Sequence, residues 1–206
     1  MTSVSIDIAH TALLLGDLQN DFLDPKGAYG RAGQSAPAIA EIPMRIAPLA
    51  HAWRTCGGLV VATLFTLVPG RGGEPIISPH LKQLRPYLRR GDFEPRAWGH
   101  DVVDELKPVD VTIEKVAYSA FHMSRLEWVL RKQDINHLLV TGIVTNGGIA
   151  STVRDAHVRD FEVTLIENGC AAFTPELHRA AVEGLRPVAR IAKISDVMAE
   201  LDRRAD

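Results

Sequence analysis

The chain has 206 residues, with 23 lysine and arginine residues against 25 aspartate and glutamate residues and a formal net charge of −2. This length suits one sizeable core, so we expect a single domain over residues 1–206. The balanced charge argues against nucleic-acid binding, and no apolar stretch reaches the roughly 20 residues of a membrane helix. No signal peptide, disulfide framework or CxxC pair is indicated. We therefore expect a cytoplasmic protein, not bound to membranes, that acts on a small molecule.

Short apolar strands alternate with amphipathic helices along the chain, a pattern typical of an α/β fold with a parallel sheet covered on both faces. Pro43 is placed to open the first helix, and Pro48 is expected to kink it. The expected strands are Ala12–Gly16, Leu59–Leu64, Val111–Glu114, His137–Ile143, Glu162–Glu167 and Ala189–Ile194. The expected helices are Ala38–Thr55, Gly99–Leu106, Ser124–Lys132, Gly148–Arg159, Pro175–Gly184 and Ser195–Arg203.

The first expected strand runs into Asp17, within the stretch ALLLGDLQNDF. An acid at the end of a buried strand is a candidate catalytic group, because perturbed acids at sheet ends cluster in active sites. The alternative is a loop cap, since Asp-x-x-Asn-Asp-Phe is also good turn chemistry. Asn20 and Asp21 are expected to shape the loop, and Phe22 is expected to form a pocket wall.

The region between the second and third strands ends at a second charged candidate. Segment Pro69–Pro95 is rich in glycine, proline and arginine, and we expect a variable loop or lid that shapes substrate choice or an oligomer contact. Lys115 ends the third strand and either pairs with Asp17 across a crevice or is an exposed strand-end lysine. Ser119 and Phe121 are expected to support and pack around this site.

The stretch Leu138–Ala156 reads LLVTGIVTNGGIASTVRDA, a buried strand followed by a Thr-Asn-Gly-Gly turn and a helix. Ala150 and Val153 recur at helical spacing after the turn. The backbone N–H groups of such a turn can bind an anion or a developing oxyanion, and glycine lets a ligand approach the main chain closely. The turn is therefore a candidate binding site.

Three stretches, in the same order, resemble the isochorismatase-like hydrolases, which include nicotinamidases and N-carbamoylsarcosine amidase. ALLLGDLQNDF resembles their first strand and Asp loop, TIEKVAYSAF their Lys strand, and TGIVTNGGIASTVRDA their nucleophile turn. The nucleophilic cysteine of that turn falls on Gly148. The resemblance implies a three-layer Rossmann-like fold with strand order 3-2-1-4-5-6 and a homo-oligomer, a dimer or larger. In that order, Asp17, Lys115 and Gly148 converge on one crevice at the carboxyl ends of the strands.

The resemblance also implies a role for each of these positions. Asp17 is the acid and base, Lys115 is its electrostatic partner, and Gly148 occupies the nucleophile position without a side chain. The amides of Val144 and Gly148 are implied to hold an oxyanion, and the Ile143–Val144 peptide bond is implied to be cis. The residues assigned to the substrate pocket are Phe22, Phe121, Asn146 and Gly147.

Gly148 cannot attack a substrate, so amide hydrolysis through a thioester is not available at this position. Within the family that the chain resembles, the isochorismatases also carry glycine there and hydrolyse a vinyl ether, with the aspartate as general acid, although the residues flanking this turn are more similar to those of the amidases. We expect a cofactor-free hydrolase that acts by vinyl-ether hydrolysis or by water-mediated hydrolysis. The alternative is a catalytically silent family member that binds a metabolite or serves as a scaffold. Val68 stands where isochorismatases carry a glutamine, so isochorismate itself is not singled out.

No metal site or nucleotide cofactor is predicted. Nicotinamidases of this family bind a divalent ion through an Asp-x-His pair after the second strand, and this chain has no such pair there. His80 and His100 are isolated, and no glycine-rich nucleotide motif occurs. Cys170 is interpreted as a small buried side chain rather than a relocated nucleophile, and Cys56 as structural or merely tolerated.

Overall fold

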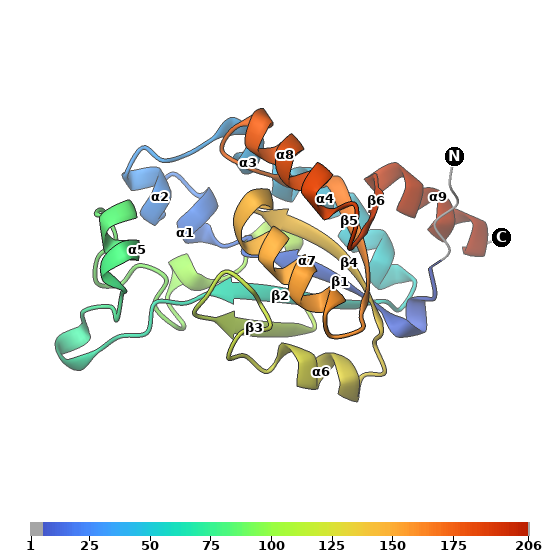
Figure 1. The fold of residues 1–206 in the computed structure, drawn as a ribbon, viewed down its shortest axis with the longest axis horizontal. Coiled ribbons are helices and arrows are strands. Elements are labelled where there is room, and N and C mark those ends of the chain that lie inside the picture. The colour runs from blue at the N-terminus through green and yellow to red at the C-terminus, as the bar shows by residue number, and fades with distance from the viewer. Residues whose placement is uncertain (1–5, 206) are drawn as a thin grey trace.

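The computed structural model describes residues 6–205, so residues 1–5 and 206 of the expected domain lie outside the described residues. A six-stranded parallel sheet with the order β3-β2-β1-β4-β5-β6 forms the centre of the described chain (Figure 1). This confirms the expected α/β fold and its strand order. The strands are β1 (Thr11–Gly16), β2 (Leu59–Phe65), β3 (Val111–Lys115), β4 (His137–Ile143), β5 (Glu162–Ala171) and β6 (Arg190–Ala192).

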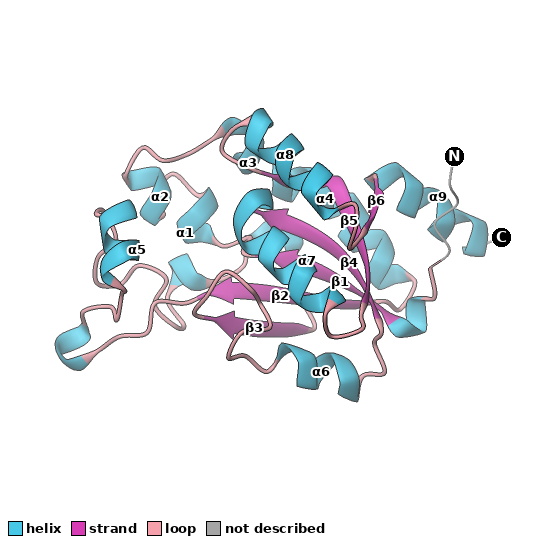
Figure 2. Ribbon diagram, in the orientation of Figure 1, coloured by secondary structure: helices cyan, strands magenta, loops and turns pink. Residues whose placement is uncertain are grey.

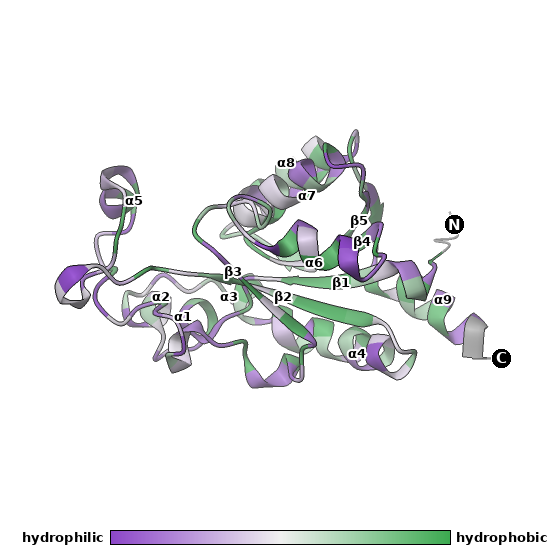
Figure 3. Ribbon diagram, turned by 90° about the horizontal axis from the view of Figure 1, so that it is seen from below, coloured by the Kyte–Doolittle hydropathy of each residue, from purple (hydrophilic) through white to green (hydrophobic). Residues whose placement is uncertain are grey.

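Helices cover both faces of the sheet (Figure 2). The helices are α1 (Asn20–Leu23), α2 (Ala28–Arg31), α3 (Pro37–Ala40), α4 (Ile42–Thr55), α5 (Pro79–Leu84), α6 (Leu126–Lys132), α7 (Ala150–His157), α8 (Pro175–Leu185) and α9 (Ile194–Ala205). Figure 3 shows α6, α7 and α8 on one face and α1 and α4 on the other. None of the helices in residues 6–205 has the length and apolar character needed to cross a bilayer.

Each face of the sheet has its own hydrophobic core. Trp53 of α4 and Val197 of α9 are fully buried in the core on one face. Val153 of α7 and Leu185 of α8 are fully buried in the core on the other. Because the strands are covered on both sides, β1 and β4 are buried at every position, which explains their continuous apolar sequences.

Several of the expected elements differ from the structure; β6, for example, is shorter than the strand expected at Ala189–Ile194. The helix expected at Gly99–Leu106 is wrong: this stretch holds two short 3₁₀ turns, because the backbone of residues 101–103 between them pairs with residues 18–20. The first expected helix is divided at Glu41, and Pro43 lies in the first turn of its second part, α4, which begins at Ile42. β5 continues beyond Glu167 to Ala171.

Two glycines let β1 and β4 approach closely at the carboxyl edge of the sheet. Gly142 has a φ of 120°, and a Cβ built there would lie 2.2 Å from the carbonyl oxygen of Gly16. No side chain fits into that space, so glycine is required at position 142. The contact brings the end of β1, which carries Asp17, next to the turn that follows β4.

Candidate active site

A buried ion pair joins the ends of β1 and β3. The Nζ atom of Lys115 lies 2.8 Å from Oδ2 of Asp17, and both side chains are more than 90% buried. Lys115 also donates to the carbonyl oxygens of Ala117 and Tyr118, at 3.0 and 3.1 Å, so the three protons of its ammonium group all have acceptors. Oδ1 of Asp17 accepts a hydrogen bond from the Thr63 hydroxyl at 2.8 Å. Both carboxylate oxygens are therefore held in place.

The backbone at Asp17 is in the left-handed region, with a φ of 56°. A non-glycine residue in this region is uncommon and is held there by its surroundings, which here include hydrogen bonds from its N–H to the carbonyl and hydroxyl of Thr63. Burial raises the pKa of Asp17, while the nearby Lys115 ammonium and the Thr63 hydroxyl offset part of that rise. A carboxyl group with a raised pKa can donate a proton nearer to neutral pH than an exposed aspartate can.

Gly148 faces this ion pair from the turn after β4. A Cβ built on Gly148 would lie 3.2 Å from Oδ2 of Asp17, 3.4 Å from the carbonyl oxygen of Tyr118 and 3.5 Å from Nζ of Lys115. A side chain at this position would therefore point directly at the acid and the ammonium. The Ile143–Val144 peptide bond, which precedes the turn, is cis.

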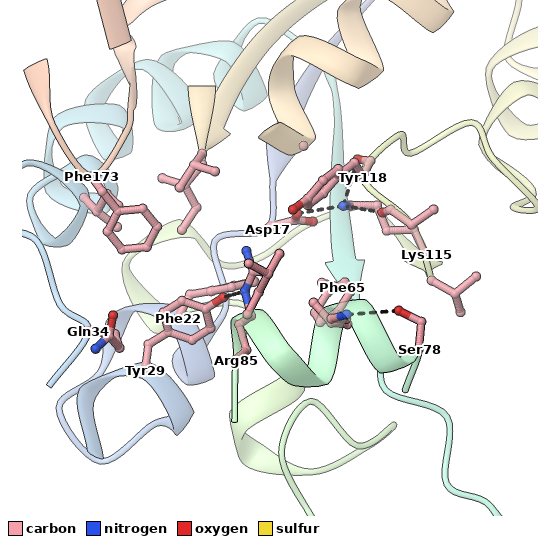
Figure 4. Close-up of a pocket in the computed structure, with 18 of the residues that line it drawn as sticks. Asp17, Phe22, Tyr29, Gln34, Phe65, Ser78, Arg85, Lys115, Tyr118 and Phe173 are labelled. Carbon is pink, nitrogen blue, oxygen red and sulfur yellow. Dashed lines mark hydrogen bonds and ion pairs between the residues drawn. The ribbon is translucent and has the colours of Figure 1, made fainter. Parts of the chain in front are cut away.

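These groups share one cavity of about 260 Å³, shown in Figure 4. Asp17, Lys115, Val144 and Gly148 lie along one part of its wall. Leu81, Leu84 and Arg85, at and just after α5, form another part. The aromatic side chains of the lining are Phe22, Tyr29, Phe65, Tyr118 and Phe173. The cavity therefore combines a largely apolar wall with a few polar groups, as is usual for small-molecule sites.

The other residues assigned to the pocket are placed differently. Phe22 lines the cavity and packs against Phe93, with ring centroids 4.5 Å apart. Phe121 is not part of the described lining, and its ring is buried in a core cluster against Phe161, with ring centroids 5.6 Å apart. Asn146 is exposed, and neither Asn146 nor Gly147 belongs to the described lining of the cavity, because the turn directs Gly148 inward instead. Val68 is exposed and also lies outside that lining.

Several site residues were not predicted from the sequence. Thr63 could have been noticed as a polar residue within the buried strand LVVATLF. Gln19 fixes the loop beside the cavity, because its side chain bonds to the backbone N–H and carbonyl of Phe65 and to the carbonyl of His100. Tyr29 and Arg85 come from segments without a recognisable motif, so no sequence signal indicated them.

The described residues contain no group of three His, Cys, Asp or Glu side chains that could hold a metal ion. The His100 side chain forms a hydrogen bond of 2.8 Å with the hydroxyl of Thr66, the residue that directly follows β2, and burial lowers the pKa of His100. Cys170 lies inside β5, and burial raises the pKa of its thiol, so it is unreactive there. The residues at this site thus do not fit the metal-binding pattern of the nicotinamidases.

Taken together, the sheet order and the buried acid–lysine pair at its carboxyl edge define an α/β enzyme-like fold with a cavity at the carboxyl ends of the strands. The model of the isochorismatase domain family matches residues 11–198, and the chain belongs to this family. The ureidoacrylate amidohydrolase RutB of Caulobacter segnis is 31% identical over 86% of this chain and 79% of its own. RutB of Pantoea ananatis is 32% identical over 83% of this chain and 73% of its own. Among solved structures, a cysteine hydrolase from Pseudomonas syringae pv. phaseolicola 1448A superposes with a TM-score of 0.81 at 23% identity, over 96% of this chain and 95% of its own.

Proposed function

We propose that the protein is a cofactor-free hydrolase of a small molecule, with Asp17 as its acid and base and without a covalent enzyme intermediate. The observation that carries this proposal is the buried ion pair of Asp17 and Lys115 beside the missing side chain of Gly148. The family membership and the relatives named as amidohydrolases support hydrolytic chemistry.

Each group at the site has a defined task in this proposal. Lys115 is fully hydrogen-bonded, so it holds the Asp17 carboxyl in one orientation and balances its charge. With an amide or ureide, the backbone amides of Val144 and Gly148 bind the negative charge that develops on the carbonyl oxygen. The open space beside Gly148 admits a water molecule or part of the substrate to within reach of Oδ2 of Asp17.

Two kinds of substrate fit this arrangement. With a vinyl ether, the Asp17 carboxyl protonates the enol-ether carbon and positive charge spreads over the adjacent carbon and oxygen. Water then adds to the oxygen-bearing carbon and returns a proton to Asp17. The resulting hemiketal splits into a ketone and an alcohol. With an amide or ureide, the Asp17 carboxylate takes a proton from the attacking water and then passes it to the leaving nitrogen. Asp17 ends each cycle in the state in which it began.

The second candidate function is a catalytically silent protein that binds a metabolite or serves as a scaffold, and the absence of a nucleophilic side chain at Gly148 favours it. A screen separates the two candidates: vinyl ethers, amides and ureides are each incubated with the protein, and product formation is measured. The proposed hydrolase turns over at least one class, and intact-protein mass spectra during turnover show no added mass. Absence of turnover in every class supports the silent protein, and a covalent adduct on the chain contradicts the non-covalent mechanism.

A further inference from the structure

Arg85 is a charged side chain in the cavity that the proposed mechanism does not use. It directly follows α5 and is partly buried. Its Nε donates a hydrogen bond to the hydroxyl of Tyr29 at 2.5 Å, and the Tyr118 side chain also interacts with it. Figure 4 shows Arg85 pointing into the cavity, with Asp17 above it in the view. A guanidinium group has five N–H donors, so several donors remain for a ligand.

No described carboxylate forms an ion pair with Arg85. Asp17, the acid in the cavity lining, pairs with Lys115, and Asp92 pairs with Arg31. Burial acts to lower the pKa of Arg85, but Tyr29 and Tyr118 raise it, and the net direction is upward. The guanidinium group is thus charged, partly desolvated and without a counter-charge, which is costly unless a ligand supplies one.

The charged groups of the cavity also favour a negatively charged ligand. The Asp17 carboxylate and the Lys115 ammonium cancel, which leaves Arg85 as the one guanidinium or ammonium charge in the described lining without a carboxylate partner. The rest of that lining is mostly apolar and aromatic, with the neutral polar side chains of Gln34 and Ser78 and the imidazole of His80. A low-dielectric wall strengthens the attraction of this charge for an anion. The ion pair and Arg85 thus line the same cavity.

We infer that Arg85 is a specificity-determining residue that binds the carboxylate of a monoanionic substrate with an apolar body. This inference rests on the proposed function and adds the substrate class to it. A planar carboxylate matches the fork of a guanidinium group and can accept two parallel hydrogen bonds from it. A dianionic phosphate is disfavoured, because one positive charge would leave it undercompensated in a largely apolar cavity. The carboxylate would be held at Arg85 while the reactive group reaches Asp17.

Equilibrium binding tests this inference without requiring turnover. Benzoate, benzamide and phenyl phosphate are titrated into the protein at one fixed ionic strength, with crotonate and crotonamide as a second pair of acid and neutral amide. The variants are Arg85→Gln and Arg85→Lys. Arg71→Gln is the matched control, because Arg71 is an exposed arginine of the same β2–β3 segment and lies outside the cavity lining. Thermal unfolding curves verify that each variant is folded.

We expect the unsubstituted protein and Arg71→Gln to bind at least one carboxylate about tenfold or more tightly than its neutral amide. Arg85→Gln loses this preference, and Arg85→Lys keeps only part of it because the fork is gone. Three results overturn the inference: no preference for either carboxylate, an unchanged preference in Arg85→Gln, or tighter binding of phenyl phosphate than of benzoate. Failure of the proposed function has a different signature, namely a carboxylate preference in a protein that turns over no substrate.

Discussion

The substitution Gly148→Cys examines whether the remaining site still accepts a nucleophile. A Cβ at this position would lie 3.2 Å from Oδ2 of Asp17, which requires a shift of a few tenths of an ångström, and its other near contacts, at 3.4 and 3.5 Å, are less tight. We expect overpacking to cost about 1 kcal/mol, partly offset by about 0.5 kcal/mol from removing a glycine from a helical turn. The free energy of unfolding should therefore change by less than about 1 kcal/mol.

The new thiol would face both halves of the ion pair. The Lys115 ammonium stabilises a thiolate and the Asp17 carboxylate can accept the thiol proton, so we expect a nucleophile with a lowered pKa. Amide turnover should rise by about 100-fold or more over the parent protein, because the thiolate opens a covalent route and the nucleophile of a working site is worth more than that. Ammonia release from small amides and ureides measures this gain.

Gly147→Cys is the matched control, because a Cβ there would face Val144 rather than the ion pair. Alkylation by iodoacetamide compares the two thiols in a Cys56→Ser background, since Cys56 is exposed and would otherwise react. The thiol at position 148 should react faster at low pH than the thiol at 147. If both folded variants show the same thiol reactivity and neither hydrolyses amides, the site is not arranged for a nucleophile at Gly148.

Three further predictions concern stability. Lys115→Met leaves Asp17 buried without its counter-charge and should lower the free energy of unfolding by about 3–5 kcal/mol in urea; a loss below about 1 kcal/mol would contradict a structural role for the pair. Burial lowers the pKa of His137 from its usual 6.5, so the unfolded chain takes up a proton that the folded chain resists and stability falls as the pH drops below about 6.5. His137→Gln should reduce this loss between about pH 7.5 and 5.5, and an unchanged pH dependence would refute the assignment. Phe121→Ala should lower the free energy of unfolding in urea by about 3–4 kcal/mol and leave the substrate KM unchanged, because the ring is in the core. A raised KM would show that Phe121 contacts the substrate.

The sequence was sufficient for the fold because the strands are covered on both faces. Such strands carry continuous apolar runs, and the run His137–Ile143 has the same bounds in the structure as in the prediction. The stretch Gly99–Leu106 failed because its helical spacing is overridden by long-range backbone pairing with residues 18–20. Local pattern gives no information about such a partner.

The sequence predicted those residues of the candidate site that directly follow a recognisable apolar strand. Asp17 and Lys115 follow apolar strands, and the parallel order brings them to 2.8 Å from each other. Arg85 lies in the segment between β2 and β3, where neither periodicity nor a motif fixes the path of the chain. The sequence also does not show which aromatic residue after β3 reaches the cavity: Tyr118 lines it, while Phe121, three residues later, is buried in the core.

The measurement that tests the central claim most directly is the kcat/KM of Asp17→Asn for a substrate found in the screen. Asp202→Asn is the control, because Asp202 is an exposed aspartate on α9 outside the cavity lining. If Asp17 is the acid and base, Asp17→Asn loses about 10²-fold or more of kcat/KM while it remains folded, and Asp202→Asn keeps full activity. A folded Asp17→Asn variant with activity within about threefold of the parent protein would contradict the account, since removal of a catalytic acid costs far more than that.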